Sequence, residues 1–553
     1  MSERAPLAAV GFSVGIVGHR VERISDPAAV RARIDEVIGA IDTALAAIAA
    51  HAPHCIYARL RLISALAEGA DRLAASAALA VGLPLDVVLP FAPAEYSRDF
   101  ADPSRAEFAT LLGRAEAVLI LDGNANARAN AYDAAGVALL DNCDLLIAVW
   151  DGRPARGRGG TREVIEEAAR RAMLVVIVSP DGARVTIRSA GPGAGPMRFD
   201  DVPEHAITEL PGLVAAIAEV GDEAEWRSFA ETPREPIIHG AYPLLLELAG
   251  VGSKRRRTPS IEAPPADPLL AAFRWWDAAA IRAAQAFRSA VIVNFALAAL
   301  AVVLAAVSVL AELWKWLFVM AEVATILLLL ANTVQAGRRR WQERWLESRE
   351  VAELLRVVIM MRLVGVGRGL VSPGEGGWIS RYVGAFARAS APHAADLGDP
   401  ATAARPLIEE VAGQAAWNAA TARRMHLAAH RIERFGEILF GLVLAAAIGW
   451  LLLFATASEL AHRLQYPLTA VTAGLPAIAT ASYGIRIILD FEGIAGRANQ
   501  IATGLEALLA RWEAGPPSAA ELQKFARRAA DIMLGDVAAW RLLAEGRRLT
   551  IPG

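Results

Sequence analysis

The residues best suited to chemistry are a short glycine run followed by a hydroxyl and a carboxylate. Gly159, Gly160 and Thr161 stand just before a helix-like pattern, and Glu163 follows within it. Glycines let backbone N–H groups approach an anion closely, and a hydroxyl at a helix start adds a further donor. Arg158 supplies positive charge immediately before the run. We therefore predict that Arg158, Gly159, Gly160 and Thr161 bind a phosphate group.

Two further polar clusters each follow an apolar, strand-like stretch. Their candidate ligand-binding residues are Gly18, His19, Arg20, Glu68, Gly69 and Asp71. A histidine and an arginine can donate to phosphate or ribose oxygens, and carboxylates commonly accept from ribose hydroxyls. The alternative is turn chemistry alone, because turns between strands and helices favour glycine whatever their function. Three such clusters together favour a nucleotide-like site.

Apolar strand-like runs alternate with helical patterns over residues 8–183. This alternation predicts an α/β Rossmann-like domain, with a parallel sheet and helices on both of its faces. Ligands of such sheets lie at the carboxyl ends of the strands, where all three polar clusters fall.

The remainder of the chain contains long apolar stretches, and the mean hydropathy of all 553 residues is +0.36. The stretches are Ala290–Leu310, Trp316–Val334, Ile438–Ala457 and Tyr466–Ile485. A helix needs about 20 residues to cross the hydrocarbon core. We therefore expect an all-α four-helix transmembrane domain, built as two hairpins with long cytoplasmic helices.

Arginines flank both hairpins on the side away from their short loops. They include Arg282, Arg288, Arg338, Arg339, Arg340, Arg431, Arg434, Arg486 and Arg497. The positive-inside rule places both termini in the cytoplasm of a four-span membrane protein. Glu322 is the ionisable residue within a predicted span, so it is a candidate for gating or for pairing at the interface. Pro476, close to Gly474, predicts a kink or a break in the fourth span.

We expect the second span to continue into a polar helix, Gln335–Leu363. Trp345, Arg349 and Glu353 recur on one side of that helix at four-residue spacing. They are candidates for coupling the domain to the membrane, and the alternative is simple packing between cytoplasmic helices. Both hairpins read as helix, span, span, helix, which suggests a duplication without proving one.

Composition limits the other possibilities. A net charge of −3 argues against nucleic acid as a partner. The two cysteines, Cys55 and Cys143, cannot form a zinc cluster, so we expect no metal site. The predicted plan is residues 8–183 as the nucleotide-binding domain, 184–266 as a connecting region with a basic, proline-rich linker, 267–363 as the first hairpin, 364–410 as a loop-rich connector, and 411–553 as the second hairpin with C-terminal helices.

The N-terminal motifs together resemble the SLOG superfamily of Rossmann-like domains. They are Gly18-His19-Arg20, Glu68-Gly69-Ala70-Asp71, Leu89-Pro90-Phe91 and Gly159-Gly160-Thr161-Arg162-Glu163. That superfamily includes LOG-type phosphoribohydrolases, DNA-processing proteins and sensors of nucleotide-derived signals. The resemblance implies a ligand such as a cyclic nucleotide or an ADP-ribose-like molecule. Glu163 matches a glutamate that takes part in catalysis in LOG-type enzymes, although this chain reads GRGGT where those enzymes read PGGxGT.

The first hairpin and its flanks resemble SLATT membrane effector domains of prokaryotic conflict systems. The matching residues are Asp277, Gln285, Arg288, Trp345, Arg349, Ala352, Glu353 and Arg356. This resemblance covers about residues 267–362. It implies an anti-phage effector that forms a pore or disrupts the inner membrane as a homo-oligomer, once a sensor domain releases it. The alternatives are a membrane-anchored nucleotide N-glycosidic hydrolase that uses Glu163, and a regulated channel or transporter with a nucleotide-binding cap.

Overall fold

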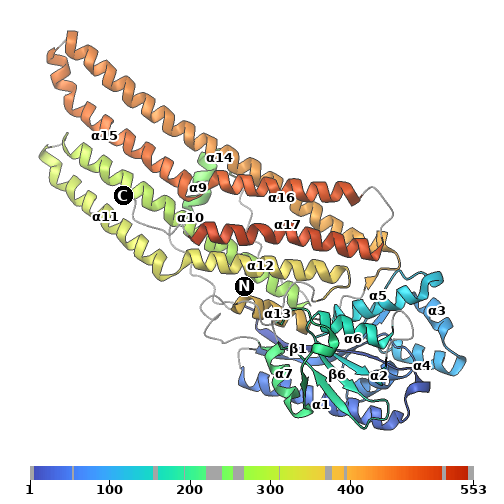
Figure 1. Ribbon diagram of the computed structural model, residues 1–553. Coiled ribbons are helices and arrows are strands. Elements are labelled where there is room, and N and C mark those ends of the chain that lie inside the picture. Colours follow the sequence, from blue (N-terminus) through green and yellow to red (C-terminus); the bar gives the residue numbers. More distant parts are fainter. Residues whose placement is uncertain are drawn as a thin grey trace.

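The protein is elongated, with an α/β domain at one end and a bundle of long helices at the other, as a computed structural model shows (Figure 1). The structure describes residues 5–52, 55–153, 160–191, 194–219, 239–252, 267–310, 312–367, 377–390, 395–456, 458–512 and 518–545.

The α/β domain is built on a sheet in the order β8-β7-β6-β5-β1-β2-β3-β4-β9. The strands are β1 Ala8–Gly18, β2 Cys55–Ser64, β3 Leu85–Leu89, β4 Ala117–Ile120, β5 Leu145–Val149, β6 Leu174–Val178, β7 Val185–Arg188, β8 Glu204–His205 and β9 Ala395–Asp396. Pairing is parallel from β6 across to β9, and β7 and β8 add antiparallel strands at one edge. The chain builds outward from β1 to β4 and then crosses back to β5, so the strand order reverses between β1 and β5.

Helices cover both faces of this sheet. In the α/β domain they are α1 Pro27–His51, α2 Ala70–Ala80, α3 Pro93–Tyr96, α4 Asp102–Leu112, α5 Arg128–Leu140, α6 Thr161–Arg170 and α7 Leu210–Ala218. The later helices are α9 Ala241–Leu248, α10 Pro268–Ser308, α11 Lys315–Arg338, α12 Trp341–Leu363, α13 Trp378–Ala389, α14 Pro400–Thr456, α15 Ser458–Ile488, α16 Phe491–Trp512 and α17 Ala519–Glu545. The predicted fold class, a Rossmann-like domain followed by an all-α region, is confirmed.

Successive residues of the strands point to opposite faces and so enter two separate cores. In β5, Leu145 and Ile147 belong to the first core, whereas Leu146 and Ala148 belong to the second. The first core also contains α1, α2 and α13 together with the first turns of α10. The second contains α5, α6 and α17 together with parts of α14 and α16. Residues of α12 contribute to both cores, so each hairpin is joined to the sheet by buried apolar packing.

The sheet includes more of the chain than the alternating pattern indicated. Strands β7 and β8 follow residue 183, and β9 comes from the segment 364–410, which was expected to be rich in loops. That segment also contains α13 and the first turns of α14. Helix α13 packs beside β1, where Tyr382 donates a hydrogen bond to the carbonyl of Pro6 at 2.7 Å.

Each hairpin enters the membrane region on a continuous helix and leaves it on a broken one. Helices α10 and α14 run for 41 and 57 residues. The helix expected over Gln335–Leu363 is instead interrupted between α11 and α12, where Arg340 adopts a left-handed φ of 50°. Asp490, with φ 52°, separates α15 from α16 in the same way. The interruption at Arg340 allows the next residue, Trp341, to be fully buried, so the prediction of one continuous helix was wrong because tertiary packing overrides local propensity.

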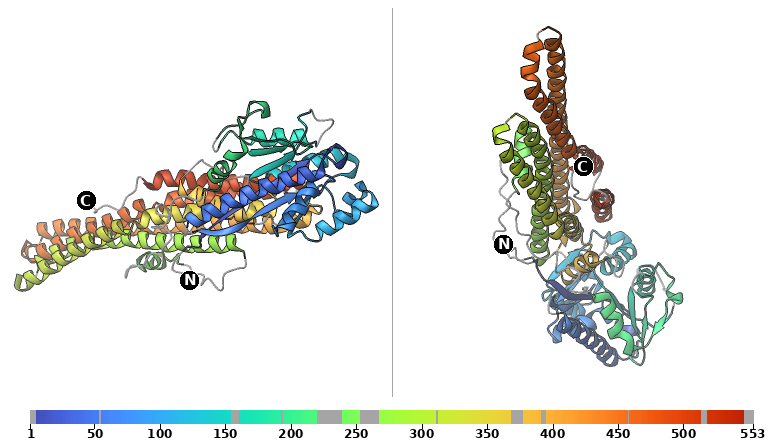
Figure 2. Two further views of the ribbon diagram at one scale, coloured as in Figure 1. Left: turned by 90° about the horizontal axis from the view of Figure 1, so that it is seen from below. Right: turned by 90° about the vertical axis from the view of Figure 1, so that its left-hand side faces the viewer.

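The membrane region contains four helices that are long and apolar enough to cross a bilayer. Of the kink or break expected at Pro476, the break does not occur, because α15 continues as a helix through that residue. A Cβ on Gly474 of α15 would lie 3.4 Å from Val303 of α10, so these residues are at the same level. Helix α10 continues five residues beyond Val303, whereas α15 begins sixteen residues before Gly474. At 1.5 Å per residue the second hairpin therefore reaches about 16 Å further than the first. In the right-hand view of Figure 2 the orange hairpin extends beyond the green one.

Candidate functional site

The reversal of strand order places the ends of β1 and β5 side by side, and His19 and Asp151 meet there. The N–H of His19 donates to the carbonyl of Val149 at 3.0 Å, and the N–H of Asp151 donates to His19 Nε2 at 3.2 Å. Arg23 donates to Asp151 Oδ2 at 2.6 Å. Nε2 of His19 also lies 3.1 Å from Asp151 Oδ1, and burial lowers the pKa of His19 although this carboxylate acts to raise it. Open α/β sheets usually bind ligands at this kind of position.

Asp151 is held as a carboxylate. Burial acts to raise its pKa, but the N–H of Arg153 and the neighbouring His19 and Arg23 outweigh that effect, and the net pKa lies below the usual value. A ligand at this place therefore meets one fixed negative charge, with Arg23 beside it and the exposed Arg20 close along the chain.

Gly18 and Gly69 allow the strand ends to approach one another. A Cβ on Gly18 would lie 2.4 Å from that of Ala70, and a Cβ on Gly69 would lie 2.4 Å from the carbonyl oxygen of His19. Gly69 also adopts a φ of +97°, which disfavours other residues. The close approach of β1 to α2 thus accounts for both glycines without a ligand.

Glu68 and Asp71 hold the loop between β2 and α2. Asp71 is buried and accepts from the N–H of Ala67 at 3.3 Å, and burial raises its pKa to about 7. Glu68 accepts from the hydroxyl of Ser104, which in turn accepts from the buried Arg72 at 2.6 Å. The structure therefore places both predicted carboxylates at the strand ends but bonds them to the protein.

The glycine run is only partly described. Arg158 and Gly159 lie outside the described residues, whereas Gly160 directly precedes α6 and Thr161 is its first residue, as predicted. The next residue, Arg162, places its guanidinium 5.2 Å from the ring of Trp150, which follows β5. The amino terminus of α6 is thus near the end of β5, where its N–H groups can meet an anion.

Glu163 lies on another side of α6. It lines a cavity of about 270 Å³ between α5 and α6, together with Asp133, Glu166, Glu167 and Arg170. Its surroundings are therefore mostly acidic, and they differ from those of His19 and Asp151.

A larger cavity of about 770 Å³ opens beside Asp151, on the side of β6 and β7. Its lining includes Arg23, Arg153, Arg184, Arg188, Trp150 and Phe199, with Asp151, Asp181 and Glu204 as acidic members. Trp150 and Phe199 meet edge to face, with ring centroids 5.7 Å apart. Arginines beside aromatic rings suit an anion that carries a flat group. Sequence reasoning missed this cavity, because Arg184, Arg188 and Phe199 follow the expected end of the domain.

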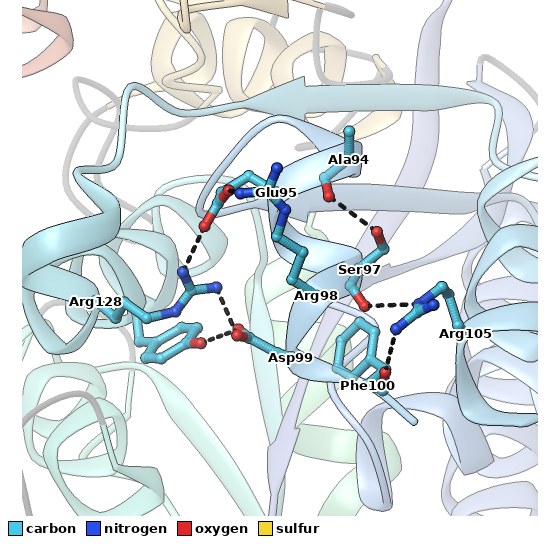
Figure 3. A network of polar contacts seen from close by, with 9 residues as sticks. Ala94, Glu95, Ser97, Arg98, Asp99, Phe100, Arg105 and Arg128 are labelled. Carbon is cyan, nitrogen blue, oxygen red and sulfur yellow. Dashed lines mark hydrogen bonds and ion pairs between the residues drawn. The ribbon is translucent and has the colours of Figure 1, made fainter. Parts of the chain in front are cut away.

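A network of ion pairs lies beyond the end of β3 and connects α3 and the following turn Ser97–Asp99 to α5 (Figure 3). Arg128 donates to Glu95 at 2.7 Å and to Asp99 at 2.6 Å, and Asp99 also accepts from Tyr132. Arg105 donates to the carbonyl of Phe100 at 3.0 Å. These charges neutralise one another, so the network acts as a support for this edge of the domain.

The predicted coupling residues form a second charged group between α10 and α12. Arg349 pairs with Glu353 at 2.5 Å and lies 3.6 Å from Asp277, and Arg356 pairs with Glu353 at 3.5 Å. Glu353 is only 4% exposed. Trp345 lies under the guanidinium of Arg288, which is 4.8 Å from its ring.

Glu322 is separate from this charged group. It lies within α11 at a half-buried position on the membrane-spanning part of the helix. Within the described ranges, no three His, Cys, Asp or Glu residues are arranged to hold a metal ion. Comparison of the chain with protein-family models gives no match, and no curated protein matches it.

Proposed function

We propose that this protein is a ligand-controlled membrane effector. An anionic, nucleotide-derived molecule binds at the ends of β1 and β5 and in the arginine-lined cavity beside them, and the spans then form a pore or disrupt the bilayer. The observation that carries this proposal is the packing of both hairpins on one sheet. Helix α10 of the first hairpin belongs to one core, α14 and α16 of the second belong to the other, and α12 of the first contributes to both. A change at the strand ends can therefore be transmitted to each hairpin through buried apolar contacts.

The route to the first hairpin is short. Trp276 of α10 donates to the hydroxyl of Tyr382 in α13 at 3.0 Å, and that hydroxyl donates to the backbone just before β1. The route to the second passes through α17, where the N–H of Ala519 donates to Asp122 at 2.9 Å, beyond the end of β4. A ligand shifts the state of the membrane only if it favours one arrangement of these contacts over another.

The resemblance to SLOG and SLATT domains supports a role in prokaryotic anti-phage defence. We propose that the protein is a homo-oligomer in the inner membrane, with four spans and cytoplasmic termini. The arginines that flank the spans on the side of the α/β domain favour this orientation. The position of Glu163 in a separate acidic cavity gives the hydrolase alternative no support.

The binding step can be tested on the full chain in detergent. We would measure its melting temperature with NAD, ADP-ribose, linear nucleotides and cyclic di- and trinucleotides. One probe should raise the melting temperature, and Arg20→Glu should abolish the rise. Arg114→Glu is the matched control, because Arg114 is also exposed but precedes β4, at the amino ends of the strands. An equal rise in both variants would contradict binding at the strand ends.

The membrane step needs its own assay. The full chain in liposomes loaded with a fluorescent dye should release the dye when the stabilising probe is added, and Arg20→Glu should suppress the release. A probe that stabilises the protein without causing leakage would contradict the effector function and leave the binding site intact.

A further inference from the structure

We propose that α9 is an in-plane membrane anchor, which inserts Leu244 and Leu248 into the leaflet nearer to the α/β domain. This helix precedes the first span and crosses beside the long helices at the level where α15 gives way to α16 (Figure 1). The inference is independent of any ligand and of any pore.

Helix α9 has two apolar sides, of which the protein covers only one. Tyr242 is buried, and Leu245 and Leu246 pack against the neighbouring core. Leu244 and Leu248, four residues apart and therefore on one side of the helix, are 55% and 78% exposed. Leu327 in the spanning part of α11 is 60% exposed, so the α9 leucines are as open as a side chain that faces lipid.

Hydrogen bonds fix α9 at the end of the apolar surface of the spans. The N–H of Tyr242 donates to Ser289 Oγ at 3.1 Å, and Ser289 immediately precedes the first apolar stretch. Arg431, just before the third, donates to the carbonyl of Ala249 at 2.6 Å. The guanidinium of Arg288 lies 5.0 Å from the Tyr242 ring. Both ends of α9 are thus held where the apolar belt begins.

Lipid is the occupant that these observations favour. The exposed leucines continue the apolar surface of the spans, and the arginines beside them lie where phosphate headgroups would be. Amphipathic helices that bind in the plane of a membrane bury their apolar side at this boundary. A second copy of the chain would cover the same leucines, and the experiment below separates the two occupants.

The test is lipid quenching of a fluorophore at position 248. In a background of Cys55→Ser and Cys143→Ala, the variant Leu248→Cys is labelled with a nitrobenzoxadiazole dye and reconstituted into phosphatidylcholine vesicles containing a doxyl lipid. Quenching should match that at Leu327→Cys in α11 and be several-fold stronger than at Val81→Cys, an exposed position of the α/β domain. Quenching no stronger than at Val81→Cys would overturn the proposal. If the dye were then also shielded from aqueous iodide, the occupant would be a second copy.

A second measurement needs no substitution and remains decisive if the cysteine variants do not fold. The unmodified chain is irradiated in vesicles that contain a diazirine lipid, and the labelled peptides are mapped by mass spectrometry. Label on residues 241–248 together with the spans is the expected result. Label on the spans alone would overturn the proposal.

Discussion

The two hairpins share one plan but are held together by different kinds of contact. In each, a continuous helix enters and a helix broken at a left-handed residue leaves, at Arg340 in the first and at Asp490 in the second. The first hairpin is fixed by directional bonds. Asn332 donates to Asn294 Oδ1 at 2.7 Å, and Asn294 donates to Thr333 at 2.8 Å, so α10 and α11 are joined within the membrane.

The second hairpin also has a bond between its helices, from Trp450 Nε1 to the carbonyl of Ala461 at 3.2 Å, but its contact with the first hairpin relies on shape. Hydroxyls on α15 bond within their own helix, as Thr472 does to the carbonyl of Leu468 at 2.9 Å. Its contact with α10 uses glycines, since Gly474 faces Val303 and Gly484 faces Phe295. Directional bonds define one register, whereas apolar contacts tolerate a shift. The comparison teaches that hydrogen bonds fix the register of α10 and α11, whereas close glycine contacts join the two hairpins.

The largest expected difference concerns buried charge. Glu353→Gln should destabilise the protein by about 3–5 kcal/mol, because it leaves Arg349 and Arg356 without their shared buried carboxylate. Glu433→Gln is the counterpart in the second hairpin, where Glu433 pairs with Arg486 at 2.9 Å but is 44% exposed. That change should cost about 0–1 kcal/mol. Similar shifts of the melting temperature in the two variants would refute the contrast.

The next effect tests whether stabilising the first core protects α10 of the first hairpin more than α17. Burial raises the folded-state pKa of Asp71 to about 7, so stability should fall as the pH rises from about 4 to about 7. The shift corresponds to about 4 kcal/mol at most. Asp71→Asn should remove this pH dependence while keeping an oxygen that accepts from Ala67. Hydrogen exchange at pH 8 should then slow more in α10 than in α17, and equal slowing would mean that the cores are not separable.

A smaller effect tests the glycine contact between the hairpins. Gly484→Ile should destabilise the protein by about 1–3 kcal/mol through overpacking, because even a Cβ there would lie 2.2 Å from the Phe295 ring. Gly441→Ile is the control, since a Cβ at Gly441 meets nothing within 4 Å. Thermal unfolding in nanodiscs would compare them, and equal stability of the two variants would argue against close packing of α15 on α10.

The smallest effect tests the hydrogen bonds by which Asn332 joins α11 to α10. Asn332→Ala should cost about 1 kcal/mol, which is typical of hydrogen bonds between helices in membranes. Thr472→Ala removes only a bond within α15 and should have almost no effect. Asn332→Ala should therefore have the lower melting temperature. A lower value for Thr472→Ala would mean that Asn332 does not fix the register of α10 and α11.

Sequence reasoning succeeded where a pattern is local and repeated. Period-two and continuous apolar runs gave the strands and the spans, and a glycine followed by a hydroxyl gave the start of α6 at Thr161. It failed where distant segments decide the structure. Strands β8 and β9 have two residues each and exist only because a sheet edge is beside them.

The same reason explains what was missed around the site. The cavity beside Asp151 depends on the antiparallel addition of β7, and Glu68 and Asp71 are bonded to their own loop by backbone geometry that the sequence does not display. Trp341 is fully buried, and its packing accounts for the end of α11 at Arg338, although the local sequence favours a continuous helix.

The unequal reach of the hairpins means that a single bilayer thickness cannot match both of them. If a flat hydrocarbon core matches α10 and α11, the first turns of α15, with Glu459, His462 and Arg463, extend beyond its far surface. A thicker membrane would draw those charges toward hydrocarbon, and a thinner one would uncover apolar side chains of the first hairpin. Lipid chain length should therefore change the thermal stability of the protein in vesicles even when no ligand is present.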